Sequence, residues 1–76
     1  MISYEPLRIL LTKQKKTFSD LRDELGIGTN TNVKMNKDSG YVSLEVIDKI
    51  ANYFSKELGR TIKIEELLEF IPDSAE

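Results

Sequence analysis

The stretch from Thr17 to Lys37, TFSDLRDELGIGTNTNVKMNK, constrains the fold of this chain more than any other. Thr17 is suited to cap a helix, since a carboxylate follows three residues later in the capping-box pattern. Apolar residues then recur every third or fourth position until Gly26, where a positive φ ends a helix at little cost. Gly28 or Thr29 can cap the next helix. The sequence therefore predicts two short helices joined by a tight glycine turn.

The longest apolar stripe lies further along, between Ser43 as an N-terminal cap and Gly59 as a stop. It consists of Leu44, Ile47, Ile50, Ala51, Phe54 and Leu58. A first helix is expected from Ser3 to Gln14, with Leu7, Leu10 and Leu11 buried, and a last helix near Ile64 to Phe70. The buried face of this last helix is predicted to be Ile64, Leu67, Leu68 and Ile71. Together these segments predict an all-α, compact, five-helix fold.

The length of 76 residues predicts a single domain over residues 1–76, with a frayed tail at residues 73–76. A chain this short buries about 60% of its unfolded surface, which leaves little room for a deep substrate cavity. No apolar run approaches the roughly 20 residues of a membrane span, and no leader is evident. We expect a soluble, cytoplasmic protein.

The residue inventory argues against an enzyme. The chain has no cysteine and no histidine, so it lacks thiolate metal ligands, the usual general base and the commonest metal ligand. The carboxylate pairs Asp23/Glu24 and Glu65/Glu66 are helix neighbours whose side chains diverge. The sequence G-I-G at 26–28 lacks the preceding strand of a nucleotide-binding loop. No catalytic residue, cofactor or metal is expected.

Charge is divided unevenly along the chain. Residues 1–37 carry seven Lys/Arg and four Asp/Glu, a net charge of 7 − 4 = +3. Residues 38–76 carry four and nine, a net charge of 4 − 9 = −5. The basic half contains the predicted helix pair. This asymmetry suits a surface that binds nucleic acid, backed by an acidic half that limits non-specific binding.

Two short helices joined in this way form the helix-turn-helix. The run L-R-D-E-L-G-I-G-T-N-T, followed by Y-V-S-L-E-V-I-D-K-I at residues 41–50, resembles the Cro and phage-repressor (XRE) type of helix-turn-helix regulator. The small stand-alone members from Gram-positive bacteria and their mobile elements are the most similar in kind. The resemblance covers nearly the whole chain. It implies a lambda-repressor-like DNA-binding domain, with the helix-turn-helix at residues 17–37 and the helix at 29–37 in the major groove.

The resemblance implies that Thr29, Asn30 and Lys34 lie where base edges are read. Their chemistry is suitable, because Asn pairs with adenine, Lys donates to guanine and a Thr methyl contacts thymine. Thr31 is added as a fourth candidate for base reading. The alternative is that these residues form an ordinary polar helix surface.

A second group, Lys15, Lys16, Thr17 and Lys37, is predicted to bind DNA phosphates. Two of these lysines stand just before the helix at Thr17, whose first N–H groups favour anions. The alternative is a solvated corner of like charges.

Two positions depart from the family pattern. Asn32 stands where the family usually has Val, Ile or Leu to anchor the reading helix. If its side chain points inward unpaired, it costs roughly 1–3 kcal/mol. Phe18 stands where the family often has a glutamine that contacts phosphate. Since Val33 and Met35 point in different directions, the helix at 29–37 depends on Ile27 and Met35, and we expect it to be the least stable element.

The expected function is sequence-specific transcriptional regulation, most simply repression, by a protein that binds double-stranded DNA. The alternative is a helix-turn-helix used as a protein-binding module, such as an antirepressor or accessory subunit, which the acidic net charge and Asn32 favour. Ile62, Phe70 and Ile71 leave two further alternatives open: they complete the core, or they form a homodimer contact.

Overall fold

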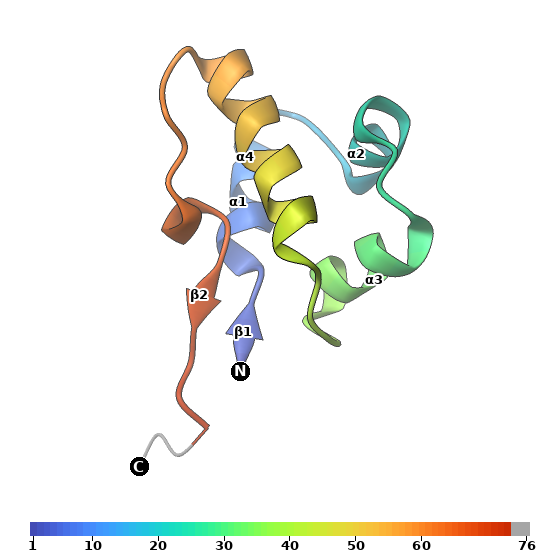
Figure 1. Ribbon diagram of the computed structural model, residues 1–76, viewed down its shortest axis with the longest axis vertical. Helices are drawn as coiled ribbons and strands as arrows, with labels where there is room; N and C mark the ends of the chain where they lie inside the picture. Colours follow the sequence, from blue (N-terminus) through green and yellow to red (C-terminus); the bar gives the residue numbers. More distant parts are fainter. Residues whose placement is uncertain (74–76) are drawn as a thin grey trace.

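The computed structural model describes residues 1–73 of the chain (Figure 1). Its elements, in order, are β1 (Ile2–Ser3), α1 (Glu5–Lys13), α2 (Phe18–Leu25), α3 (Thr29–Lys37), α4 (Leu44–Leu58), the 3-10 turn η1 (Ile64–Glu66) and β2 (Glu69–Phe70). The mostly helical fold was predicted correctly.

Local capping chemistry sets the ends of α2 and α4 as predicted, whereas the predicted cap of the first helix, Ser3, was wrong, because Ser3 lies in β1 and Tyr4 precedes α1 without a side-chain cap. The Thr17 hydroxyl accepts a hydrogen bond from Asp20 N at 3.2 Å, and the Asp20 carboxylate accepts one from Thr17 N at 2.8 Å. This reciprocal capping box starts α2, which ends at Gly26 with φ 72°. Helix α4 starts at Ser43, whose hydroxyl accepts from Val46 N, and ends at Gly59 with φ 67°.

The core is built around α4. Three of its side chains, Ile47, Ile50 and Phe54, are almost completely buried. They meet apolar side chains from every other helix and from the C-terminal segment: Tyr4, Leu7, Leu10, Leu11, Leu21, Ile27, Met35, Ile62 and Leu67. The predicted stripe was wrong at one position, since Leu44 is 79% exposed. Leu44 is the first residue of α4, one turn before Ile47, and none of the described segments covers it.

The expected fifth helix does not form. Residues 64–66 make a single 3-10 turn, in which Ile64 is half exposed and the following Leu67 is fully buried. The chain then extends, and β2 pairs antiparallel with β1 in the register Ile2↔Phe70 and Ser3↔Glu69. The apolar spacing suited a helix, but pairing with a strand from the other end of the chain satisfies the backbone instead. Strand β1 was not predicted.

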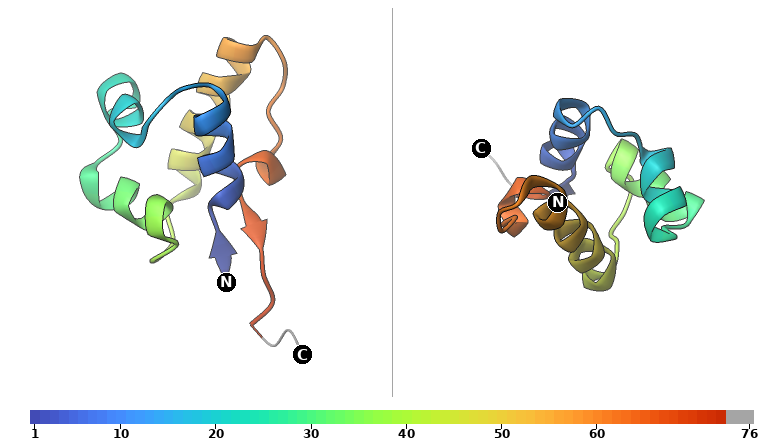
Figure 2. Two further views of the ribbon diagram at one scale, coloured as in Figure 1. Left: turned by 180° about the vertical axis from the view of Figure 1, so that it is seen from behind. Right: turned by 90° about the horizontal axis from the view of Figure 1, so that it is seen from above.

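The helix-turn-helix and this ribbon lie on opposite sides of the molecule. Helices α2 and α3 lie to one side of the α1–α4 pair, whereas η1 and β2 lie on the other in both views (Figure 2). Of the expected tail, only Asp73 is described, and its carboxylate accepts a hydrogen bond from the Met1 amino group. Residues 74–76 lie outside the part of the chain described.

Candidate nucleic-acid interface

Helix α3 divides into a narrow buried face and a broad polar face. Met35 is fully buried, and Val33, two residues earlier, is 43% exposed, as the predicted register requires. Asn32 is also buried, at 8% exposed. Its amide nitrogen donates to the Phe18 carbonyl of α2 at 3.0 Å, but its buried Oδ1 has no hydrogen-bond partner within residues 1–73. Asn32 thus replaces the expected aliphatic anchor with a half-satisfied polar group.

The four predicted base-reading residues are not equally available. Thr29, Asn30 and Lys34 are exposed, whereas Thr31 is half buried. The aliphatic stem of Lys34 lies against Gly40, where an added Cβ would be 3.2 Å from Lys34 Cδ. This close approach places Lys34 beside the loop that follows α3.

Sequence reasoning missed several residues on the same face. A hollow of about 180 Å³ between α2 and α3 is lined by Phe18, Ser19, Arg22, Thr29, Asn32, Val33 and Asn36. Thr29, Val33 and Asn36 follow one another at spacings of four and three, so they form one row along α3. That spacing was visible in the sequence and could have identified Val33 and Asn36. Arg22 adds a positive charge from α2.

The predicted phosphate-binding residues fall into two groups. Lys16 lies in a network on the inner side of the α1–α2 connection, with its Nζ 3.6 Å from Glu24, 3.9 Å from Glu57 and 5.5 Å from the centre of the Tyr53 ring. The Thr17 hydroxyl is also engaged, since it donates to Asp20 at 3.2 Å. Both side chains would have to give up contacts to reach a phosphate.

Lys15 and Lys37 are differently placed. Both are exposed, and within residues 1–73 neither has a carboxylate at ion-pair distance. Lys15 terminates α1 in a left-handed conformation, with φ 57°. Lys37 is the last residue of α3. Their ammonium groups are therefore the most available cations of the predicted set.

A polar cluster closes the C-terminal end of α3. Asp38, the residue after α3, receives hydrogen bonds from Arg8 of α1 and from the backbone N–H of Tyr4. The Arg8 guanidinium, followed by the Tyr4 N–H, lowers the pKa of Asp38 to about 2 despite partial burial. Arg60 similarly lowers the pKa of Glu66, on the far side of the molecule, to about 2. Both carboxylates are thus held ionised.

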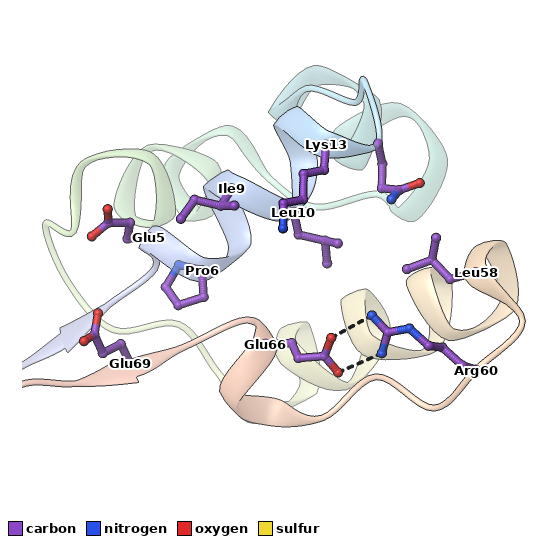
Figure 3. Close-up of a pocket in the computed structure, with 10 residues that line it drawn as sticks. Glu5, Pro6, Ile9, Leu10, Lys13, Leu58, Arg60, Glu66 and Glu69 are labelled. Atoms are coloured by element: carbon purple, nitrogen blue, oxygen red, sulfur yellow. Dashed lines mark hydrogen bonds and ion pairs between the residues drawn. The ribbon is translucent and has the colours of Figure 1, made fainter.

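The described residues hold no group of three or more His, Cys, Asp or Glu side chains arranged to bind a metal ion. In the same part of the chain, no helix has the length and apolar character needed to cross a membrane. A hollow of about 710 Å³ lies between α1 and the C-terminal segment (Figure 3). Its rim is charged, and the Arg60–Glu66 ion pair forms one of its walls.

Comparison with known protein families identifies the kind of domain. The sequence model of the Cro/C1-type HTH DNA-binding domain matches residues 6–73. The match begins at the second residue of α1 and covers α2, α3, α4, η1 and β2. No curated protein and no solved structure matches the chain.

Proposed function

Because the chain belongs to the Cro/C1-type helix-turn-helix DNA-binding family, we propose that it is a sequence-specific transcriptional regulator that inserts α3 into the major groove. The family is typically non-enzymatic, and double-stranded DNA is its partner. The observation that carries the proposal is the polar face of α3, which has exposed amide, hydroxyl and ammonium groups and few apolar ones.

Base reading is assigned to Thr29, Asn30 and Lys34, with Val33 as an apolar addition. A valine methyl can contact a thymine methyl, as a threonine methyl can. Thr31 was included in the sequence-based set, but its half-buried position supports it least. Each good base contact is worth roughly 1–3 kcal/mol of discrimination.

Phosphate binding is assigned first to Lys15 and Lys37. They stand at the ends of α1 and α3, and their exposed ammonium groups can move to meet the DNA backbone. Lys16 and Thr17 are secondary contacts in this proposal, because each already has partners within the domain. Phosphate contacts position the protein without carrying sequence information.

Repression by a homodimer is the simplest mode of action. A bound domain can occlude a promoter without a further activity, and a two-fold dimer suits a pseudo-palindromic site. Ile62 lies in the core, so of the three residues considered for a dimer contact Phe70, 70% exposed on β2, offers the most apolar surface. Sedimentation of Phe70→Ser beside Leu44→Ser tests this surface: the dimer should weaken only in the first variant.

Selection of bound sequences from a random DNA pool tests the function. A preferred site should emerge, and Asn30→Ala should then reduce the ratio of specific to non-specific affinity at a fixed salt concentration. Lys37→Ala should leave that ratio unchanged and reduce the salt slope by about 1. If no sequence is enriched and the protein is not retained on bulk DNA at low salt, the protein-binding module replaces this proposal.

A further inference from the structure

We infer that Asp38 and Arg8 are positioning residues for α3, which hold the C-terminal end of this helix in the orientation needed to read bases. The inference rests on the proposed function of α3. Asp38 and Arg8 are separated by 30 residues and join two helices. Neither residue is among those expected to touch DNA bases.

The contact between them is a two-point fork. Arg8 Nη1 donates to Asp38 Oδ1 at 2.9 Å, and Nη2 donates to Oδ2 at 3.1 Å. The same Nη1 also donates to the backbone carbonyl of Met35, in the last turn of α3, at 2.9 Å. Two parallel charge-assisted bonds fix an angle as well as a distance. The guanidinium therefore holds both the end of the helix and the residue that closes it.

The Asp38 carboxylate also accepts hydrogen bonds from the segment that precedes α1. Tyr4 N donates to Oδ1 at 2.7 Å, and the hydroxyl of buried Ser3 donates to Oδ2 at 3.2 Å. Ser3 belongs to β1, which is itself held by β2. Asp38 adopts a left-handed conformation, with φ 53°. Aspartate tolerates this conformation better than most residues, and here it lets one side chain reach three segments.

The loop after α3 is attached to the same place. The buried Tyr4 hydroxyl donates to the Gly40 carbonyl at 3.0 Å and accepts from Val42 N at 3.2 Å. The end of α3 and the loop that leads to α4 are thus bound to one short stretch of chain. Lys34, a proposed base reader, packs against that loop at Gly40.

Helix α3 needs this attachment because its apolar anchoring is small. Met35 is its one fully buried apolar side chain, and Asn32 contributes a single hydrogen bond. Apolar contacts are non-directional and let a short helix tilt or slide, whereas bidentate hydrogen bonds do not. Small displacements of α3 would move Asn30 and Lys34 out of register with base edges.

The chain contains a matched control in Arg60 and Glu66. Their bonds are also bidentate, at 2.8 and 3.0 Å, and they join the end of α4 to η1 (Figure 3). The segment over residues 59–66, which carries both residues, runs beside β2 and away from α2 and α3 (Figure 1). The Arg60–Glu66 pair has the same chemistry as the Arg8–Asp38 pair, but it is not connected to α3.

The test compares Asp38→Asn with Glu66→Gln. Each substitution removes one negative charge and keeps the side-chain shape. Asp38 lies nearer the proposed DNA surface than Glu66, so Asp38→Asn should raise affinity for all DNA somewhat more, but neither electrostatic gain should change the ratio of specific to non-specific affinity. Dissociation constants are measured on the selected site and on unrelated DNA, at one salt concentration and well below the melting temperature of each variant. Asp38→Asn should lower the ratio of specific to non-specific affinity about fivefold or more, on the scale of one lost base contact. Glu66→Gln should leave the ratio unchanged.

Amide exchange supplies the second readout. In Asp38→Asn, protection should fall in α3 while the core amides of α4 remain protected. Arg8→Lys keeps the charge but loses the fork, so it should lower the specificity ratio too, and it decides the matter if Asp38→Asn does not fold. The positioning role is overturned if the ratio of specific to non-specific affinity is unchanged in folded Asp38→Asn, or in Arg8→Lys when Asp38→Asn does not fold. It is also overturned if Glu66→Gln lowers the ratio as much as Asp38→Asn does. A wild-type protein without any preferred site overturns the proposed function instead.

Discussion

Helices α3 and α4 are held in the domain by different kinds of interaction. Helix α4 has 15 residues, a serine side-chain cap and three almost completely buried apolar side chains. Helix α3 has nine residues, no side-chain cap, one buried apolar residue and one buried asparagine. The first is stabilised by apolar burial, and the second depends on polar contacts at its sides and its C-terminal end.

The difference follows from what each helix presents to solvent. A helix that reads DNA needs a polar outward face. A short helix of this kind therefore has only two or three inward positions whose side chains can attach it to the core. In α3, the hydrogen bonds of a buried asparagine and of the Asp38–Arg8 pair fix the orientation of the helix, because little apolar area is buried there. We therefore expect α4 to determine whether the domain folds, and α3 to open before the rest does. The following predictions test this comparison, in order of decreasing effect.

Truncation in α4 should have the largest effect. Phe54→Ala should cost about 3–5 kcal/mol, because it leaves a cavity at the centre of the core. That is a large part of the stability expected for a small domain. Leu44→Ala, in the exposed first turn of the same helix, should change stability by less than about 0.5 kcal/mol. Urea unfolding of both variants measures the contrast, and similar midpoints would show that α4 is not central.

Truncation in α3 should cost less globally and act more locally. Met35→Ala removes the one fully buried apolar side chain of this helix and should cost about 2–4 kcal/mol. Amide exchange should show α3 losing protection while α4 keeps it. Val33→Ala, on the exposed face of the same helix, should leave protection unchanged. Equal loss of protection in α3 and α4 would mean that the two helices open as one unit.

Acid should weaken the end of α3 through Asp38. Its pKa is lowered from 3.8 to about 2 in the folded protein by the bonds from Arg8 and Tyr4. A carboxylate with a depressed pKa stabilises the fold above about pH 4, and this stabilisation is lost as the pH falls toward 2. It should amount to roughly 1–2 kcal/mol, allowing for partial solvent exposure.

Asp38→Asn should lack this stabilisation at neutral pH, and its stability should change less between about pH 4 and 2 than that of the wild-type protein. Acid titration with exchange or backbone signals from α3 measures it. Glu66→Gln is the control, since it should flatten the response of the C-terminal segment and not that of α3. Unchanged acid dependence in Asp38→Asn would contradict the assignment.

The smallest expected effect is an increase in stability, on substitution of Asn32. Asn32→Leu keeps the branched shape of the side chain and removes the unpaired Oδ1, at the loss of one hydrogen bond to Phe18. The Phe18 carbonyl lies in the first turn of α2, where it can still accept the helical bond. Stability should therefore rise by about 1 kcal/mol, and the melting temperature by a few degrees. A lower melting temperature would show that the Phe18 bond outweighs the orphaned oxygen.

Most of the helical framework could be predicted because its signals are local. The capping box at Thr17, the stops at Gly26 and Gly59 and the cap at Ser43 each act within one or two turns of chain. The inward positions of α3 were predicted correctly too, since the angle between Val33 and Met35 is a property of any helix. The residues proposed to contact DNA remain predictions, and their exposure is what the structure adds.

The sequence by itself determined the four helices, most of their ends and the family to which the chain belongs. Only the tertiary structure decided that residues 64–70 form a 3-10 turn and a strand, because the partner strand lies nearly 70 residues away. It also decided the network that occupies Lys16 and the fork between Arg8 and Asp38. Helix caps and apolar periodicity depend on residues that are close together in the sequence. Contacts between residues 30 or more positions apart depend on how the whole chain packs, and no local pattern encodes them.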